Sequence, residues 1–321
     1  KRMIKPVILA FAMMGAICCS AQQSPLSLDE VAETIKVGGY PDWIELDKHT
    51  AWVANDAIDS MQCFDAKSNK LIKAIYVNKP CAAFTIGFGS LWTVSCGEHA
   101  LMRFDLTSGK TIASIPMTLA DNEGSIVAAS GGVWVLSDDK GVLLRIDPKT
   151  NTVVTKIHVR AGSYAVMGGY GAIWITNTKD GSVERIDPIE NKVVANIPVG
   201  KQPRFLTLGE GGVWTLNQED GSVTRIDPRT NQVIAHIDCG VPGTGGDISA
   251  GEGYVWVRAK KELLLAIDPK SNKVVAKFGP VAGSGAVRAG GDYVWVSAHD
   301  VNKIWKLKAN VLKKQAVGGR Q

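Results

Sequence analysis

The sequence predicts an all-β protein, a seven-bladed β-propeller with four-stranded antiparallel blades, on three observations. Tryptophans recur with successive separations of 40, 42, 40, 40, 42 and 39 residues. An aspartate that closes a strand keeps the same step, and 34 glycines suit a chain with many tight turns. Repeats of about 40 residues with four short strands each are typical of propeller blades. The recurring tryptophans are Trp52, Trp92, Trp134, Trp174, Trp214, Trp256 and Trp295.

The chain opens with the layout of a secretory signal peptide. Lys1, Arg2 and Lys5 precede an apolar run that ends at Cys19, and small residues follow. The run is too short to span a membrane, so we assign residues 1–21 to a signal peptide and 22–321 to one domain. A lipoprotein anchor on Cys18 or Cys19 is the alternative, although the residue before either cysteine is not small. We expect a periplasmic or secreted protein.

Seven units follow the signal, at approximately 41–78, 79–118, 119–160, 161–200, 201–240, 241–280 and 281–321. Each contains a short strand, a Trp strand such as VWVLS, a RID strand and an alternating strand such as KVVANIPVG. The segments DPKTN, DPIEN, DPRTN and DPKSN between the last two strands are expected turns. There Pro presets φ, Asp bonds the local backbone and Asn tolerates a left-handed conformation. The repeated tryptophans are expected to pack between neighbouring blades.

A closed ring hides its sheet edges, so the last unit needs a fourth strand. Residues 33–38 resemble the fourth strand of a unit and precede the first complete one. We expect this N-terminal strand, within 32–38, to complete the seventh blade beside Trp295 and Trp305. The C-terminal stretch 310–318 is the competing candidate for that place.

The pattern VWVxN…GSVxRIDPxTNxVVAxIPVG resembles the YVTN family of WD40-like propeller repeats, which occur in bacterial periplasmic and archaeal surface-layer proteins. The resemblance covers nearly all of the chain after the signal. It is closest in units 161–200 and 201–240, whereas the unit with Cys96 and the last unit depart from it. The resemblance implies a fold rather than a function, because the matching residues are those that build blades.

One face of a propeller carries the links between units and the turns between second and third strands, and ligands usually bind there around the channel. The residues that the repeat assigns to this face differ from unit to unit, whereas blade-building positions are uniform. Such a mixture of acids, aromatics and arginines suits a protein, peptide or glycan ligand. Besides Asp42, the candidate ligand-binding residues are Trp43, Asp56, His99, Glu123, Tyr164, Arg204, Asn217, Arg258 and His299.

The sequence contains no recognisable catalytic or metal-binding motif. HExxH, paired CxxC and G-x-S-x-G motifs are absent, and the Gly-rich stretches 240–247 and 279–286 lack the ending of a phosphate loop. An acid–base or metal site built from His99 and His299 with Glu98, Glu123 or Asp300 is an alternative. Solvent-exposed histidines are the simpler interpretation. We therefore expect no cofactor and no metal.

Four cysteines remain after the signal. Cys81 precedes and Cys96 follows the Trp strand of the second unit, so both should lie on one face of one blade. A Cys81–Cys96 disulfide suits an oxidising compartment, and Cys63 and Cys239 should lie far apart and unpaired. The alternative is four small buried thiols.

The net charge of +5 comes from the two ends of the chain. Residues 1–21 hold three positive charges and residues 303–321 hold six, which leaves 27 basic against 31 acidic residues in 22–302. A mildly acidic body makes nucleic acid an unexpected partner.

We expect an exported, monomeric, non-enzymatic scaffold that binds an envelope or extracellular protein, peptide or glycan, with no transmembrane segment after the signal. A metal-dependent lyase or lactonase similar to streptogramin B lyase is the first alternative, although the Trp-Phe-Thr-Glu strand of that family is missing. Non-specific DNA binding through the basic C-terminal stretch is the second.

Overall fold

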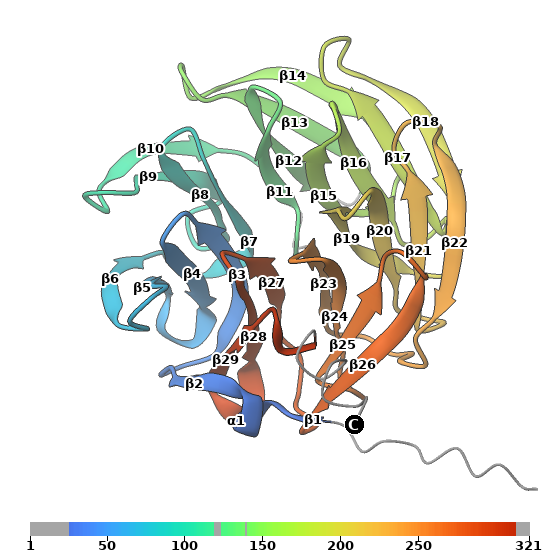
Figure 1. Ribbon diagram of the computed structural model, residues 1–321. Coiled ribbons are helices and arrows are strands. Elements are labelled where there is room, and N and C mark those ends of the chain that lie inside the picture. Colours follow the sequence, from blue (N-terminus) through green and yellow to red (C-terminus); the bar gives the residue numbers. More distant parts are fainter. Residues whose placement is uncertain (1–25, 119–122, 139, 313–321) are drawn as a thin grey trace, which may run out of the picture.

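The computed structural model describes residues 26–118, 123–138 and 140–312, so the predicted signal peptide lies outside the described residues. Within this range, twenty-nine strands form seven sheets around a central axis, and Figure 1 looks along that axis. Each sheet contains four antiparallel strands in a simple up-and-down order, and one sheet has in addition a two-residue strand, Leu26–Ser27, that pairs in parallel with its outer strand. The predicted all-β, seven-bladed propeller is confirmed.

In blades 1 to 6 the four antiparallel strands run in chain order from the channel outward (Figure 1). Blade 1 contains β3 (Pro41–Asp47), β4 (Thr50–Asn55), β5 (Ser60–Asp65) and β6 (Leu71–Tyr76). Blade 2 contains β7 (Pro80–Gly87), β8 (Ser90–Ser95), β9 (Ala100–Asp105) and β10 (Thr111–Pro116). Blade 3 contains β11 (Ile126–Ala129), β12 (Gly132–Asp138), β13 (Val142–Asp147) and β14 (Thr152–His158). Blade 4 contains β15 (Ser163–Gly169), β16 (Ala172–Asn177), β17 (Ser182–Asp187) and β18 (Lys192–Pro198).

The remaining blades follow the same plan. Blade 5 contains β19 (Pro203–Gly209), β20 (Gly212–Asn217), β21 (Ser222–Asp227) and β22 (Gln232–Asp238). Blade 6 contains β23 (Asp247–Gly251), β24 (Tyr254–Arg258), β25 (Leu264–Asp268) and β26 (Lys273–Gly279). Blade 7 contains β27 (Val287–Gly290), β28 (Tyr293–Ala298), β29 (Lys303–Lys308) and the N-terminal β2 (Ala32–Lys36). The short elements outside the blades are β1 (Leu26–Ser27), α1 (Leu28–Val31), η1 (Asp56–Ile58) and η2 (His299–Val301).

The N-terminal strand closes the ring. β2 runs antiparallel to β29 as the outer strand of blade 7, with Thr34 opposite Trp305. Because a strand from one end of the chain completes a sheet from the other end, blade 7 has the same four strands as its neighbours. The predicted N-terminal closure is confirmed, with the strand at 32–36 rather than 33–38. Part of the basic C-terminal stretch, residues 303–308, is the strand β29 itself.

The repeated tryptophans form the core, as predicted. All seven are at most 2% exposed. In blades 2 to 6 each indole N–H donates to a backbone carbonyl five residues earlier, at 2.9–3.1 Å. Burial of the large ring is therefore combined with a satisfied donor, which is the arrangement that makes a buried tryptophan stabilising.

The DPxxN turns also behave as predicted. Asn151, Asn191, Asn231 and Asn272 have φ between 52° and 60°, in the left-handed region. The backbone N–H groups of Asn151, Asn231 and Asn272 donate to the carbonyl of the aspartate four residues earlier, at 2.8–2.9 Å. The aspartate side chains accept backbone N–H groups of the same turns. These residues therefore shape turns and are not ligands.

The same asparagines also receive a contact from the preceding blade. Arg185 of blade 4 lies 5.1 Å from the centre of the Trp174 ring, and its Nη1 donates to the Pro228 carbonyl and to Asn231 Oδ1 of blade 5. We call this arrangement the inter-blade clamp. It recurs from blade 2 to 3, 3 to 4 and 5 to 6, through Arg103, Arg145 and Arg225. The RID and DPxxN motifs are therefore two halves of one contact between consecutive repeats.

Lysines replace the arginine at two other boundaries. In blade 1, Cys63 stands at the position that the clamp arginine has in other blades. Lys73, the residue opposite Cys63 on the next strand, donates to the Leu106 and Thr107 carbonyls of blade 2. In blade 7 the side chain of Lys306 is fully buried, and its Nζ lies 3.1 Å from Asn69 Oδ1 of blade 1. A cation thus links these blades as well.

The boundary between blades 6 and 7 is built differently. Its arginine position is Ala266, opposite Trp256, and Ala266 packs in an apolar cluster with the fully buried Leu28 of α1. β1 pairs in parallel with β26 of blade 6, and β2 belongs to blade 7. The N-terminal segment 26–36 therefore bridges the boundary that lacks the arginine.

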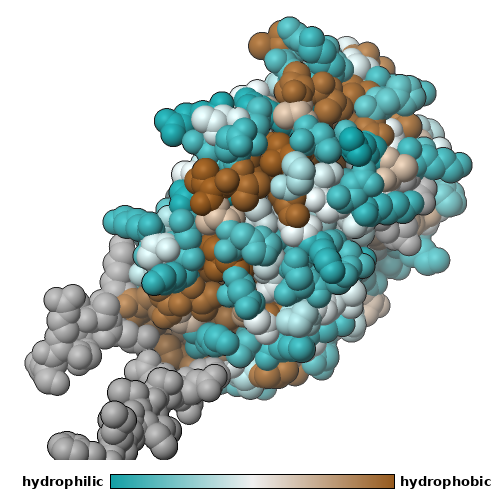
Figure 2. All heavy atoms as spheres, turned by 90° about the vertical axis from the view of Figure 1, so that its right-hand side faces the viewer, coloured by the Kyte–Doolittle hydropathy of each residue, from teal (hydrophilic) through white to brown (hydrophobic). Residues whose placement is uncertain are grey.

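The outer rim exposes apolar side chains between polar ones. Figure 2 shows this mixture on the side of the ring that lies to the right in Figure 1. Val194 on β18 and Val233 and Ile234 on β22 are exposed there. Outer strands have one solvent-facing side, so scattered apolar residues need no special function.

Candidate functional site

The innermost strands place large side chains of opposite blades in contact across the channel. Trp43 on β3 and Phe205 on β19 lie with ring centroids 6.0 Å apart. Arg288 on β27 lies 4.3 Å from the centre of the Trp43 ring. Blades 4 and 7 carry only Ala165 and Ala286 at the strand position of Trp43, which leaves room for the indole. Trp43 is 9% and Phe205 2% exposed, so these rings plug the channel.

An ion network lies beside this plug. Arg288 contacts Asp247 of β23 in a close ion pair and has its Nε 3.4 Å from Glu45 Oε1. The Trp43 indole N–H donates to the same Glu45 oxygen at 3.1 Å. Burial raises the pKa of both carboxyls, and the Arg288 charge opposes that rise. Because these groups satisfy one another, the network holds the plug in place and leaves little for a ligand.

The open end of the channel begins just before the plug. Asp42 precedes Trp43 on β3, and its Oδ1 lies 2.8 Å from His299 Nε2 at the start of η2 in blade 7. The two atoms are not aligned as a hydrogen bond, and Nε2 has no hydrogen-bond partner among the described residues. The imidazole contacts the Tyr40 ring at a centroid distance of 4.4 Å, with the ring planes tilted by 44°. Blades 7 and 1 thus contribute a carboxylate, an imidazole and a phenol at one place.

Two further carboxyls interact with this pair. The pKa of Asp56 at the start of η1 is raised to about 7, first by the surrounding protein and then by the charges of Asp42 and Glu123, while His299 lowers it. The pKa of Glu123 is also raised to about 7, first by the surrounding protein and then by Asp42, while Arg204 and His299 lower it. Both residues nevertheless expose surface to solvent. Each of these carboxyls therefore contacts solvent on one side and protein on the others.

Blades 4 and 5 complete the rim of this opening. The Arg204 guanidinium lies 4.5 Å from the centre of the Tyr164 ring, which meets Phe205 edge-on at 5.8 Å. Burial and the Glu123 charge raise the pKa of the Tyr164 hydroxyl, and Arg204 lowers it. We name the group of Asp42, Asp56, Glu123, Tyr164, Arg204 and His299 the mouth cluster.

Most of the residues that sequence analysis proposed for the ligand face converge here. Asp56, Glu123, Tyr164, Arg204 and His299 belong to the mouth cluster, and Trp43 lies in the plug next to it. They come from five blades, because each blade contributes the start of its inner strand or the turn after its Trp strand.

Two predicted ligand residues are buried and correct that prediction. The side chain of Asn217 is fully buried and donates to Ser222 and Thr224, so it fixes the turn of its own blade. The side chain of Arg258 is also fully buried, and its guanidinium donates to the carbonyls of Ala259, Gly283 and Ser297. Burial lowers the pKa of Arg258 to about 10. Both residues hold loops and neither is open to a ligand.

His99 is exposed but is not the counterpart of His299. It has φ 51° and ends the turn of blade 2, whereas His299 begins the turn of blade 7. The blade 2 counterpart of His299 and Asp56 is Cys96, which follows its Trp strand by the same number of residues. The carbonyl of His99 accepts from Met117. The paired-histidine alternative therefore loses its geometric basis.

Four functional-site neighbours were missed from the sequence: Tyr40, Glu45, Asp247 and Arg288. Glu45 and Arg288 occupy one position of the inner strand, where other blades have Thr85, Thr207 or Ser249. Those hydroxyls accept a backbone N–H of the next blade. Blades 3 and 4 have Val127 and Met167 at this position, so a comparison across the repeats could have identified Glu45 and Arg288 as its charged residues.

The cysteines divide into a pair and two thiols. Cys81 and Cys96 form a disulfide with Cα atoms 5.7 Å apart, beside the open end of the channel in blade 2. Cys63 and Cys239 are free and buried, and burial raises the pKa of the Cys239 thiol to about 12. Those thiols are unreactive at neutral pH because the thiolate is not populated.

Neither a metal site nor a membrane helix is found in the described part of the chain. Across residues 26–118, 123–138 and 140–312, no group of three or more His, Cys, Asp or Glu side chains is arranged to hold a metal ion. Within the same ranges, no helix has the length and apolarity to cross a membrane.

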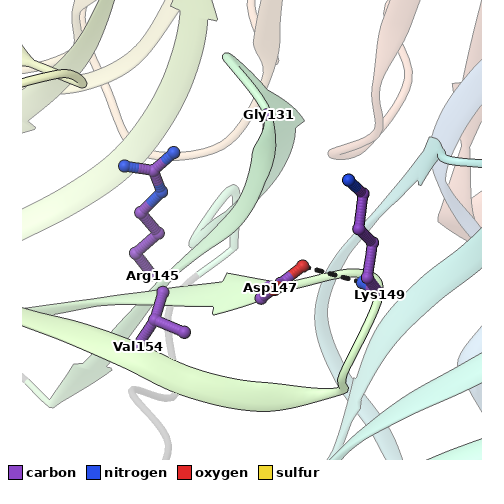
Figure 3. A pocket seen from close by; sticks show the side chains of 5 residues that line it. All are labelled: Gly131, Arg145, Asp147, Lys149 and Val154. Carbon is purple, nitrogen blue, oxygen red and sulfur yellow. Dashed lines mark hydrogen bonds between the residues drawn. The ribbon is translucent and has the colours of Figure 1, made fainter.

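A shallow pocket of about 260 Å³ lies on the opposite face (Figure 3). Its lining includes Arg145, which belongs to the inter-blade clamp, and Asp147, which accepts the Lys149 backbone N–H at 2.8 Å. Because both polar groups have structural partners, this pocket is a gap between turns and not a second candidate site.

Comparisons with protein family models and with curated proteins identify no family for the chain. No protein family model matches the chain, so membership of the YVTN family is not confirmed. No curated protein matches it either.

Solved structures are similar at low identity. A catalytically inactive virginiamycin B lyase from Staphylococcus aureus with quinupristin is 15% identical, with a TM-score of 0.74 over 86% of this chain and 98% of that one. A streptogramin B lyase is 18% identical, with a TM-score of 0.73 over 86% and 96%. BamB from Moraxella catarrhalis is 10% identical, with a TM-score of 0.62 over 83% and 84%. These similarities show the propeller fold.

Proposed function

We propose that the protein is an exported, non-enzymatic scaffold that binds a protein or peptide ligand at the mouth cluster. The observation that carries this proposal is the convergence of charged and aromatic side chains from five blades at one end of the plugged channel. Blade-building positions are nearly identical between repeats, but the mouth positions are not. Side chains that do not serve the repeat and still meet at one place favour a binding role.

The composition of the mouth cluster favours recognition of a polar ligand. It offers carboxylates, a guanidinium, an imidazole and two phenol rings if Tyr40 is included. Aromatic and arginine side chains at a concave surface are typical anchors of protein interfaces. The buried plug behind them gives these anchors a rigid support, and preorganisation reduces the entropy cost of binding.

A displayed library of random peptides tests this function. We expect peptides to be enriched by the purified protein and to lose binding to a Tyr164→Ala/Arg204→Ala double variant. Arg229→Ala, an exposed residue of a turn on the opposite face, is the control. Enrichment that the double variant retains in full would place the binding surface elsewhere, and a library with no enriched peptide would remove the proposal.

A lyase activity is the second candidate, because the Asp42–His299 pair stands beside two carboxyls with pKa values about 7. Groups that titrate near neutrality are suited to proton transfer. Incubation with quinupristin, followed by chromatography, tests it directly. Turnover that is lost in His299→Ala would establish the activity, and an unchanged compound after prolonged incubation would exclude this substrate.

A further inference from the structure

The mouth cluster has an excess of negative groups on one side. The charges of Asp42 and Glu123 raise the pKa of Asp56, and the charge of Asp42 raises the pKa of Glu123. The cation Arg204 is engaged with the Tyr164 ring on the side of blades 4 and 5. Arg258 also acts electrostatically on Asp42, but its guanidinium is buried and donates to three backbone carbonyls. The other basic group near the three carboxyls is His299. Within the described residues, the carboxyls therefore lack a full set of cationic partners.

His299 supplies an independent indication that this place receives a ligand. The residue is only 9% exposed, yet its Nε2 makes no hydrogen bond within the described residues despite lying 2.8 Å from Asp42 Oδ1. A buried polar atom without a partner costs free energy and is uncommon in native structures. The neighbouring Tyr40 ring is 45% exposed, so an aromatic surface is open beside the carboxyls.

We propose that the mouth cluster receives a cationic side chain, an arginine or lysine of a peptide or protein partner, between the carboxyls of Asp42, Asp56 and Glu123. This inference rests on the proposed binding function and names the chemistry of its ligand. A guanidinium can donate to two carboxylates at once, and its flat face can stack on a phenol ring. The contact also relieves the repulsion among the three carboxyls. A metal ion fits less well, because the described side chains form no ligand group for one.

Binding of such a cation is coupled to protons. The charged groups that face Asp56 and Glu123 are Asp42, Asp59, Asp247, His299 and Arg204. Burial by the surrounding protein, and then the acids among these groups, keep the two carboxyls partly protonated at neutral pH. A cation binds the ionised carboxylates, so its uptake releases protons near pH 7. Affinity therefore rises as the pH rises from 6 to 8, and the proton release disappears once both carboxyls are ionised in the free protein.

Matched pentapeptides test the proposal. The probes are acetylated and amidated Gly-Gly-X-Gly-Gly, with X as arginine, lysine, citrulline or glutamate. Citrulline has nearly the shape of arginine but no charge. We expect the arginine and lysine peptides to bind at least tenfold more tightly than the other two by calorimetry. Titrations at pH 7 in buffers of different ionisation enthalpy should show proton release for these two peptides. Equal affinity for arginine and citrulline would overturn the proposal.

Charge-neutral variants locate the site. Asp56→Asn and Glu123→Gln alter exposed side chains, so both variants are expected to fold, and each should weaken the arginine peptide at least fivefold. Glu190→Gln on the opposite face is the control and should leave affinity unchanged. If library peptides lose binding to the Tyr164→Ala/Arg204→Ala variant but show no preference for cations, the proposed function stands and this inference fails. If the mouth variants bind both the library peptides and the arginine peptide as tightly as the unchanged protein does, the proposed function and this inference both fail.

Discussion

Arg185 of blade 4 and Asn231 of blade 5 are joined by a hydrogen bond of 2.8 Å between Nη1 and Oδ1. The asparagine can accept this bond because its left-handed backbone conformation presents the side chain to the neighbouring blade. The arginine can donate it because the Trp174 ring lies against the guanidinium and holds it in place. At each such clamp, a blade thus holds its arginine in position to contact the asparagine of the next blade.

Removal of this contact should weaken the ring measurably. Arg185→Ala loses a charge-assisted hydrogen bond and a cation–π contact, and we expect a decrease of about 2 kcal/mol in the free energy of unfolding. A double-mutant cycle with Asn231→Ala, followed by urea denaturation, isolates the pair. Additive effects of the two substitutions would show that the contact contributes no coupling energy.

The plug should be the most sensitive position of the channel. Trp43→Ala removes a nearly buried ring that contacts residues of opposite blades, and the expected loss is about 3–5 kcal/mol by thermal or urea unfolding. Trp43→Phe keeps most of the volume but cannot donate to Glu45, so it should be destabilised less. A Trp43→Ala variant as stable as the unchanged protein would mean that the channel can close without the ring.

The mouth carboxyls predict a pH dependence of stability. Folding raises the pKa of Asp56 from 3.8 and of Glu123 from 4.5 to about 7. The folded state therefore binds more protons than the unfolded state between these values, and these two groups make stability decrease as the pH rises from about 4 to about 7. The melting temperature of the Asp56→Asn/Glu123→Gln variant should depend less on pH in that window. Identical pH profiles would contradict the raised pKa values.

The disulfide should stabilise blade 2. Cys81 and Cys96 are 15 residues apart in sequence, and a loop of that length corresponds to about 3 kcal/mol in the chain-entropy account. We expect the Cys81→Ser/Cys96→Ser variant to unfold at lower urea concentration than the oxidised protein. Cys63→Ser serves as a control for the loss of a thiol alone. Unfolding curves that coincide with and without reductant would show that the bond does not form in solution.

The sequence predicts most of the fold because the repeat is regular. Trp174, Asp187 and Asn191 keep their spacing in neighbouring units, and each has one structural role that its type and position determine. The N-terminal closure was also predictable, since residues 32–36 resemble an outer strand. The role of Arg185 was not, because its partner lies in the next repeat and local turn chemistry already explains Asn231 without it.

The candidate site was predictable only in part. Repeat alignment places Asp56, Glu123 and His299 near the channel, because the turns they belong to lie at one end of the ring. Repeat alignment does not reveal which of these side chains already have hydrogen-bond partners within the protein. Arg258 ends the Trp strand β24 next to such a turn, but its guanidinium donates to the carbonyls of Gly283 and Ser297. Whether Arg258 is open to a ligand depends on packing between blades 6 and 7, and the sequence pattern of one repeat does not predict that packing.

The pairing of Ala32 with Leu307 determines which blade can be completed last during folding. β2 is among the first segments of the domain to be synthesised, yet its partner β29 is among the last. Blade 7 cannot be completed until nearly the whole chain exists, whereas blades 1 to 5 consist of consecutive residues and need only local pairing. Contacts between distant residues form slowly. The final and slowest step of folding should therefore be the capture of the N-terminal strand by the last blade.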